Sequence, residues 1–316
     1  METETIPRHE FWRRQYRDRR YARHLSQPEL NRRVRDIFLN LLRLTPEAKI
    51  GLPALEDKLA VWMEKWTHVL EEMQLRHGPY PAGFTRDTLH SEAFPNFASE
   101  LAAKAATTLF ARGLKKGETF IKFGKRTHMN SLYERGELRI QPASFFLDKQ
   151  HTGSIKDDEL TLPLSFALSR DDVIKLVLNP QDVPNNIPEQ RMNVQFRSST
   201  DYWLYCVTTS IESRLFVDFH ADACVIIRDR GEFSRMLREA SHEKLGEATM
   251  REAPAIYVDP LLPTTSSIFV PFSKHFGYSY QDEYRFRWLP PKPIERVEHV
   301  DVQLGSLKGI AELVQL

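Results

Sequence analysis

The pattern of apolar residues changes near residue 114, and this change limits the possible folds more than any other feature of the sequence. Before it, apolar residues recur at three- and four-residue spacing, which is typical of amphipathic helices. After it, short apolar runs of strand length dominate. Strands and helices do not alternate regularly there, so we expect an α+β or mixed sheet rather than a doubly wound one.

Helices are predicted for the first third of the chain, which we expect to form a helical domain over residues 1–113. Ser26 and Glu29 form a capping box, with Pro28 in the first turn, and the helix they begin ends before Pro46. The longest helix is expected over 53–77, and an alanine-rich helix over 94–112 ends at Gly113. The apolar stripe of the longest helix is predicted to be core and comprises Leu55, Leu59, Trp62, Trp66, Val69, Leu70 and Met73.

The second expected domain, residues 114–316, is predicted to be α+β with a mainly antiparallel sheet. It opens with a strand at 120–123, a short helix at 128–135 ended by Gly136, and a strand at 138–141. An amphipathic helix is expected over 231–244, and residues 179–190, rich in proline and asparagine, are expected to be a loop. Apolar runs cover 160–168 and 173–178, the latter read as a helix capped by Ser169. Further strands are expected at 192–197, 202–208, 223–227, 255–258, 278–288 and 299–304.

Composition excludes several classes of protein. The net charge of +1 is not the strong basic excess of a chain that mainly binds nucleic acid. Apolar runs stay short of the about 18 residues that a membrane span needs, and no signal peptide is evident, so we expect a cytoplasmic protein without a membrane partner. Cys206 and Cys224 lie in apolar, strand-like segments and are expected to be reduced core thiols. The motifs GxxxxGK[ST], GxGxxG, GxSxG and HExxH are all missing.

The segment YSYQDEYRFRW at 278–288 carries the strongest chemical signal. Read as one strand, its alternation places Gln281 and Glu283 on the same face as Arg285. A carboxylate at such a place can stabilise the positive charge that develops when a glycosidic bond breaks. The Gln-x-Glu pair resembles the signature of ADP-ribosyltransferases. That resemblance implies that Glu283 stabilises the transition state as nicotinamide leaves, and that Gln281 orients the acceptor.

Two further segments extend the resemblance. FIKFGKRTHMNSLYERGELRIQPASFF, at 120–146, resembles the opening of bacterial ADP-ribosyltransferase-like families. It implies that Lys122, Arg126 and His128 hold pyrophosphate or ribose. The hydroxyl-rich end of YCVTTS, at 205–210, resembles the Ser-Thr-Ser strand of toxin-type transferases. The nicotinamide pocket would then be lined by Ser144, Phe145, Thr208, Thr209 and Ser210.

The order of these segments is the one that the superfamily uses, and residues 118–290 also resemble a bacterial family of unassigned activity. The resemblance implies an ADP-ribosyltransferase-like fold and an NAD-consuming enzyme, either a transferase or an NAD glycohydrolase. NAD would be its substrate, and the acceptor an unknown protein or nucleic acid. A role as a bacterial toxin, an effector or a phage-defence protein would suit such an enzyme.

Two alternatives remain open from the residues themselves. In the first, the chain is a non-enzymatic module, and the basic, aromatic segment 8–25 binds nucleic acid or an acidic protein, or simply packs on a neighbouring helix. In the second, Asp157, Asp158 and Glu159 hold magnesium in a nuclease. These three carboxylates are equally compatible with a solvated turn, or with salt bridges to Arg285 or Arg287.

Overall fold

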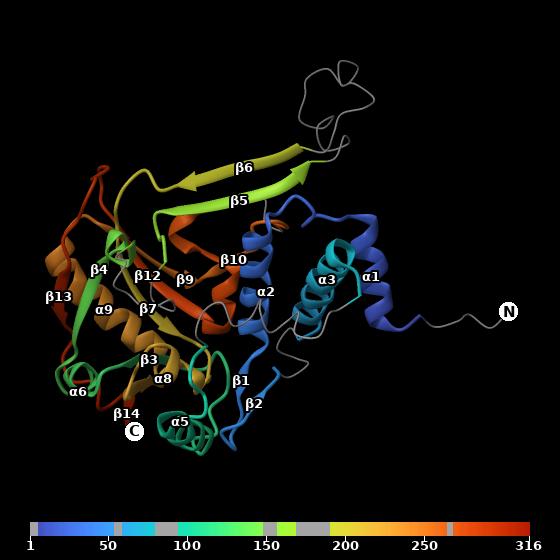
Figure 1. Ribbon diagram of the computed structural model, residues 1–316. Coiled ribbons are helices and arrows are strands. Elements are labelled where there is room, and N and C mark those ends of the chain that lie inside the picture. The colour runs from blue at the N-terminus through green and yellow to red at the C-terminus, as the bar shows by residue number, and fades with distance from the viewer. Residues whose placement is uncertain (1–5, 54–58, 80–93, 148–156, 169–189, 264–267) are drawn as a thin grey trace.

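The computed structural model describes residues 6–53, 59–79, 94–147, 157–168, 190–263 and 268–316. Within them the molecule is α+β, with the first helices of the chain at one side and, at the other, a mainly antiparallel sheet flanked by the remaining helices (Figure 1). The α-helices are α1 (Arg8–Asp18), α2 (Gln27–Leu41), α3 (Leu59–His77), α5 (Glu100–Phe110), α6 (Arg126–Arg135), α8 (Arg214–Asp218) and α9 (Arg230–Leu245). Short 3-10 helices are η2 (Ala143–Leu147), η4 (Val270–Phe272) and η5 (Phe276–Gln281).

Most strands belong to one large sheet, with smaller two-stranded sheets beside it. The strands of the large sheet are β3 (Phe120–Gly124), β4 (Glu137–Pro142), β7 (Trp203–Thr208), β8 (Ala223–Ile227), β9 (Thr249–Pro254), β12 (Glu283–Leu289), β13 (Val300–Gln303) and β14 (Ala311–Gln315). The two-stranded sheets are formed by β1 (Arg43–Leu44) with β2 (Ile50–Gly51), β5 (Thr161–Leu168) with β6 (Gln190–Arg197), and β10 (Ile256–Val258) with β11 (Ser273–His275).

Strand β7 is the centre of the large sheet. One of its edges pairs with β12 along the whole strand, from Trp203 opposite Trp288 to Thr208 opposite Glu283. The other edge is shared, because β4 pairs with the first two residues of β7 and β3 pairs only with Thr208. From β4 the sheet continues to β13, and from β3 it continues to β8 and β14. Strands β3 and β4 therefore diverge along β7, and among the described strands none pairs with residues 205–207 on that edge.

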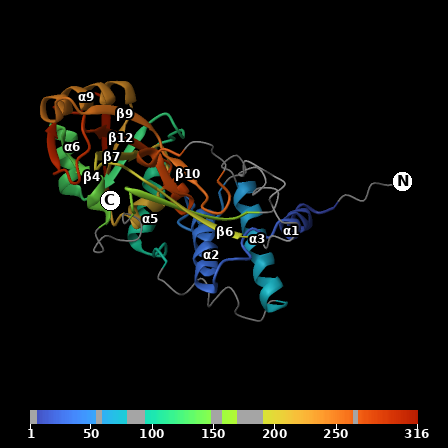
Figure 2. The ribbon, with the colours of Figure 1, turned by 90° about the horizontal axis from the view of Figure 1, so that it is seen from above.

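Helix α6 joins β3 to β4 across this gap, as the sequence predicts, and Gly136 ends it in the left-handed conformation with a φ of 67°. Helix α9 covers one face of the sheet, where Phe233 and Leu237 pack on Tyr205 and Phe286. Helices α5 and α8 cover the other face, packing on Ile121 and Cys224 of β3 and β8. Figure 2 shows the sheet between these two helical layers. Both cysteines are free thiols, as expected.

The helices of the first third also follow the sequence, except that the helix predicted over 94–112 begins only at Glu100, where the Ser99 side chain caps it, and ends at Phe110. Ser26 and Glu29 form the predicted capping box at the start of α2, since the Ser26 N–H donates to Oε2 of Glu29 at 2.7 Å. Of the predicted stripe on α3, Trp62, Val69 and Met73 are buried, and they form one cluster with residues of α1 and α2. Leu55 lies outside the described residues.

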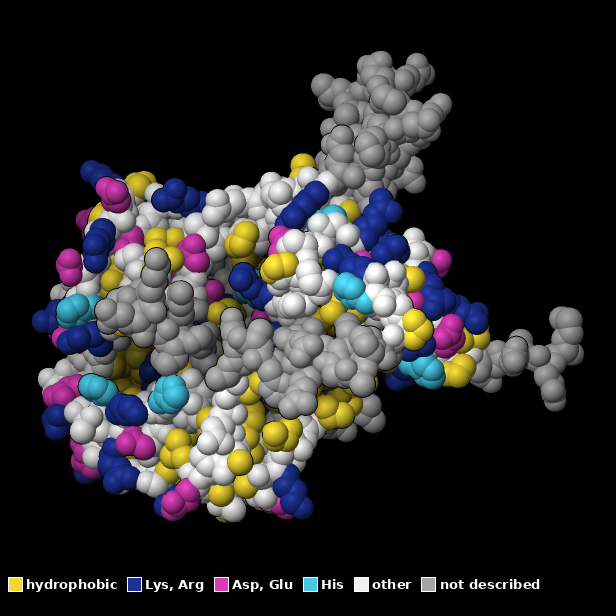
Figure 3. Space-filling model, in the orientation of Figure 1, with side chains coloured by type: hydrophobic (Ala, Val, Ile, Leu, Met, Phe, Trp, Pro, Cys, Tyr) yellow, Lys and Arg dark blue, Asp and Glu magenta, His cyan; other side chains and the backbone are white. Residues whose placement is uncertain are grey.

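The basic, aromatic segment 8–25 packs on α3 rather than extending as an arm. Tyr16 and Tyr21 are buried against His68 of α3, and the Tyr16 hydroxyl donates to Glu72 at 2.6 Å. Arg17 pairs with Glu71 at 2.7 Å. Basic side chains are nevertheless frequent on this side of the molecule, whereas both signs of charge are interspersed over the sheet (Figure 3). This segment is therefore a packed helix that pins its aromatic residues to a neighbour.

One sequence prediction in the sheet is wrong in part. Residues 278–281 do not extend the strand predicted over 278–288, because they belong to the 3-10 helix η5, and Asp282 turns the chain with a φ of 40°. Alternation is real only from Glu283 onward, where Glu283 and Arg285 do share a face. The predicted helix at 173–178 and the loop at 179–190 fall almost wholly outside the described residues. Strands β9 and β14 were not predicted.

Candidate functional site

A cavity of about 1190 Å³ opens where β3 and β4 diverge along β7. Its walls come from both faces of the sheet. Glu243 and Lys244 of α9 lie on one side, and Glu159 and Lys274 lie on the other. The cavity is thus a consequence of the sheet topology, because it occupies the place where a strand would otherwise pair with the middle of β7.

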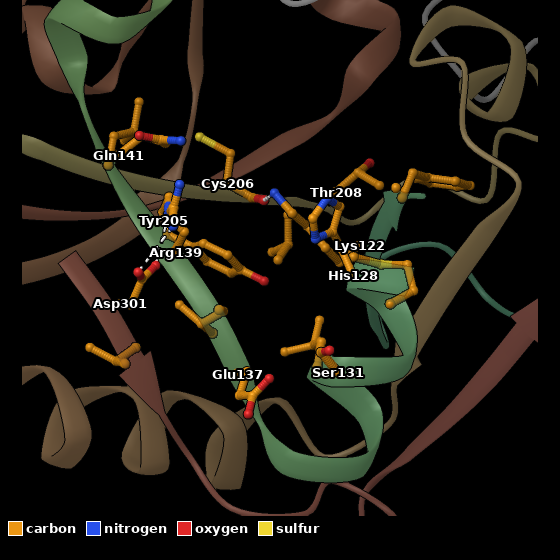
Figure 4. Close-up of a pocket in the computed structure, with 18 of the residues that line it drawn as sticks. Lys122, His128, Ser131, Glu137, Arg139, Gln141, Tyr205, Cys206, Thr208 and Asp301 are labelled. Atoms are coloured by element: carbon orange, nitrogen blue, oxygen red, sulfur yellow. Dashed lines mark hydrogen bonds and ion pairs between the residues drawn. The ribbon is translucent and has the colours of Figure 1, made fainter. Parts of the chain in front are cut away.

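Five of the predicted site residues line this one cavity, although they come from four separate segments. They are Lys122, His128, Thr208, Gln281 and Glu283. Figure 4 shows Lys122 and His128 pointing into the same space as Tyr205, beneath Thr208. β3, α6, β7 and the junction of η5 with β12 converge there, and nothing in the local spacing of the residues imposes this convergence.

The other five predicted residues lie elsewhere. Arg126 faces away from the cavity, since its guanidinium donates to the carbonyl of Leu316 at 2.6 Å. Ser144 and Phe145 line a second cavity of about 190 Å³ on the far side of β4, where the Ser144 hydroxyl donates to Asp201 at 2.7 Å. Thr209 and Ser210 lie beyond the end of β7 and serve the turn there. The Thr209 hydroxyl donates to the carbonyl of Asp282 at 3.2 Å.

Thr208 fixes the turn that brings Gln281 and Glu283 into the cavity. Its hydroxyl donates to the carbonyl of Gln281 at 2.5 Å, and it lies directly opposite Glu283 in the strand register. Opposed residues in antiparallel strands point to the same face, so Thr208 and Glu283 lie together. The backbone N–H of Glu283 donates to the hydroxyl of Tyr257 at 2.8 Å.

Glu283 is held as a buried anion between two cations. Lys274 donates to its Oε2 at 2.7 Å, and Arg285 donates to its Oε1 at 2.5 Å. Burial alone would raise the pKa of this carboxyl, but the charges of Arg285 and Lys274 outweigh burial and lower the pKa to about 2. Glu283 is therefore ionised at neutral pH and fixed in orientation.

Glu159 completes this network. From the sequence it was a candidate magnesium ligand, part of a solvated turn or a salt-bridge partner of Arg285 or Arg287, but not a residue of the NAD site. Arg285 donates to its Oε1 at 2.9 Å and forms an ion pair with its Oε2 at 2.7 Å, so that one guanidinium links Glu159 to Glu283. Burial raises the pKa of Glu159 to about 7 against the attraction of Arg285, and the Asp157 carboxylate adds to the effect. Lys274 and Arg285 supply two positive charges to the three carboxylates Asp157, Glu159 and Glu283, so one carboxylate is left without a compensating charge.

The magnesium hypothesis for residues 157–159 is not supported by the geometry. Asp157 lies 3.7 Å from Lys274, and Asp158 accepts the backbone N–H groups of Leu160 and Thr161. Among the described residues, which include all three of these carboxylates, no group of His, Cys, Asp and Glu is placed to hold a metal ion. The salt bridge to Arg285, one of the alternatives from the sequence, is the arrangement found.

Lys122 occupies the gap in the sheet itself. Its Nζ donates to the carbonyl of Cys206 at 2.7 Å and lies 4.5 Å from the centre of the Tyr205 ring. The side chain thus satisfies a backbone carbonyl on the edge of β7 that no strand pairs with. Burial lowers the pKa of Lys122, although the nearby charge of Glu283 opposes this shift.

Sequence reasoning missed Tyr205 and Lys274 as site residues. Lys274 lies in SKHF, a segment without a recognisable motif, and only the parallel pairing of β10 with β11 brings it beside Glu283. Tyr205 lies in an apolar strand and looks like core, which it is for most of its ring. Neither residue carried a signal that could have identified it.

Comparison of the chain with protein-family models, with curated proteins and with solved structures gives no match. The likeness to ADP-ribosyltransferases therefore depends on the residues and their arrangement alone. Across the residues that the structure places, no helix has the length and apolar character of a membrane span.

Proposed function

We propose that this chain binds NAD in the cavity at the divergence of β3 and β4 and breaks the bond between nicotinamide and ribose. The observation that carries the proposal is the convergence of Lys122, His128, Thr208, Gln281 and Glu283 on that cavity. Ligand cavities commonly measure roughly 300–1,000 Å³, so a cavity of about 1190 Å³ has room for a dinucleotide.

Glu283 supplies the negative charge that the reaction needs. As nicotinamide leaves with the electrons of the glycosidic bond, positive charge develops on the ribose ring, and a fixed carboxylate stabilises it. Glu283 is ionised at neutral pH and oriented by Lys274 and Arg285, so it does not have to reorganise during the reaction. The ribose carbon that nicotinamide has left then bonds to the oxygen of water or to the hydroxyl, carboxylate or amine of an acceptor, and the proton of water, hydroxyl or amine passes to solvent.

Two side chains near the gap suit the rest of the dinucleotide. Lys122 lies on the floor of the cavity, and His128 lies exposed in the first turn of α6 beside it. The start of a helix favours negative charge, and the N–H groups of its first turn can donate to anionic oxygens; at α6 the N–H of Arg126 already donates to Asp222, which leaves those that follow it. We therefore assign the pyrophosphate or ribose to this end and the nicotinamide to the end with Gln281 and Glu283.

The first test measures nicotinamide released from NAD by the wild-type chain and by Glu283→Gln. We expect release by the wild type and a fall of at least about a hundredfold in the variant, the usual cost of losing a stabilising group in the transition state. Glu239→Gln, an exposed glutamate of α9 outside the cavity, is the matched control and should keep full activity.

Glu283 is buried, so its loss also threatens folding. His128→Ala changes an exposed residue and should leave the thermal midpoint unchanged while raising the KM for NAD. Absence of nicotinamide release from the folded wild-type chain at millimolar NAD would rule out the enzymatic proposal. Binding of NAD without release would instead favour a ligand-binding module, an alternative that fits the engagement of both Glu283 oxygens by cations.

A further inference from the structure

The segment 273–283 carries three of the groups at the reactive end of the cavity. Lys274 lies at its start in β11, Gln281 is the last residue of the 3-10 helix η5, and Glu283 begins β12. Between Lys274 and Glu283, the chain leaves the two-stranded sheet of β10 and β11, and η5 packs against helix α2. The placement of Gln281 and Glu283 therefore depends on where Phe276 and Gly277 are held.

Helix α2 holds this segment through a fully buried asparagine. The Nδ2 of Asn40 donates to the carbonyl of Gly277 at 2.7 Å and approaches the carbonyl of Phe276 at 3.3 Å. The fit is close, because a Cβ added at Gly277 would lie 3.1 Å from the carboxylate of Asp36 on α2 and 3.0 Å from Nδ1 of His275. Glycine therefore avoids crowding where the segment approaches α2, and it does not serve a left-handed turn, because its φ is not positive.

A second link runs from the helices through β10. Arg33 of α2 donates from its two terminal guanidinium nitrogens to the two carboxylate oxygens of Asp259, each at 2.9 Å. Lys65 of α3 donates to the same carboxylate at 2.6 Å. Asp259 directly follows β10, whose Tyr257 accepts the N–H of Glu283. The Phe276 ring stacks on Trp62 of α3 with their centres 5.9 Å apart.

We infer that α2 and α3 set the geometry of the cavity, with Asn40 and Gly277 as positioning residues for Gln281 and Glu283. The contacts are independent of what the cavity binds, and their effect on catalysis rests on the proposed function. Helices α2 and α3 then help to shape the site, although none of their residues lines the cavity. A change on α2 should reach Glu283 through the backbone of residues 276–283.

The test compares Gly277→Ala with Gly309→Ala. A Cβ at Gly277 would lie 3.0–3.1 Å from side-chain atoms of His275 and Asp36, so that η5 or these side chains must shift by a few tenths of an ångström, whereas a Cβ at Gly309 meets nothing within 4 Å. We expect amide hydrogen exchange over residues 276–285 to quicken about tenfold in Gly277→Ala and to stay unchanged in strand β8 and in Gly309→Ala. For nicotinamide release, we expect kcat to fall about tenfold with KM for NAD within about twofold, because a misplaced group costs rate rather than binding.

Asn40→Leu is the second variant, since it keeps a similar volume and removes both donors. It should produce the same local rise in exchange. Unchanged exchange over 276–285 in both folded variants would overturn the inference, as would a uniform rise throughout the sheet. If the wild type releases no nicotinamide and the exchange pattern is as expected, the proposed function fails and the positioning role of α2 stands.

Discussion

The buried network around Arg285 shows how far single residues could be read from the sequence. Alternation from residue 283 correctly placed Glu283 and Arg285 on one face, and a salt bridge from residues 157–159 to Arg285 was among the alternatives. Which carboxylate would pair could not be predicted, since Glu159 and Arg285 are 126 positions apart. Their meeting depends on the packing of the β5–β6 sheet against β11.

Arg285→Met is expected to destabilise the protein strongly. The substitution fills the volume and removes the charge that compensates Glu159 and Glu283, and breaking a buried ion pair from one side typically costs about 3–5 kcal/mol. Arg139→Met is the control, because Arg139 pairs bidentately with Asp301 at an exposed site, where such pairs contribute less than about 1 kcal/mol. Urea unfolding measures both, and equal losses would contradict a structural role for the network.

At the scale of elements, local signals gave the start of the sheet correctly. The strand, short helix, glycine and strand of residues 120–142 were predicted within two residues, because periodicity and the Gly136 cap agree there. The strand predicted over residues 278–282 was wrong. The residue types alternate there as they do in a strand, but the hydrogen bond from the Thr208 hydroxyl and the positive φ of Asp282 bend the backbone. Strands β9 and β14 are half-exposed or at an edge, so their patterns are weak.

Gly136→Ala should test the junction of α6 with β4. A Cβ there would lie 2.2 Å from the carbonyl oxygen of Gly305, at a residue with positive φ. We expect a loss of more than about 2 kcal/mol, since backbone clash adds to the roughly 1–2 kcal/mol of left-handed strain. Gly113→Ala shares the positive φ and has open space around its Cβ, so it should lose only the strain. Similar unfolding midpoints for the two variants would contradict this account.

Across the whole molecule, the division near residue 114 describes secondary structure better than packing. Helix α5 lies before that boundary but packs on the sheet, with Ala105 and Leu109 against Ile121 and Leu215. Helix α2 is tied to the second part through Asp259 and Gly277. Ion pairs between residues 226 positions apart leave no trace in local sequence patterns, so the sequence alone could not show these contacts.

Stability should depend on pH through two buried histidines near the junction of helices and sheet. Burial lowers the pKa of His68 and of His275 to about 4. Below about pH 6.5 the unfolded chain takes up protons on both residues and the folded chain does not, so the free energy of unfolding falls as pH falls from about 6.5 to about 4. The ceiling is about 1.4 kcal/mol per pH unit for each histidine.

Urea unfolding of the wild type and of His68→Gln across this range measures the effect. The difference in the free energy of unfolding between the two proteins isolates the contribution of His68. Carboxyls that titrate over the same pH range contribute equally to both proteins, among them Glu159, whose raised pKa acts in the opposite direction. The difference in stability should widen steadily with pH, in favour of the wild type, until it levels off near neutrality. A constant difference would mean that His68 does not titrate differently in the two states.

The divergence of β3 and β4 also bears on how such a chain can evolve. The opening beside β7 is a missing stretch of backbone pairing, and its walls are side chains from β3, α6, α9 and β12. The exposed ones, such as His128 and Arg139, can be exchanged without disturbing the hydrogen-bonded ladder that holds the sheet together. Descendants of this fold could therefore acquire new ligands by point substitution, and directed evolution of the lining is a practical route to altered specificity.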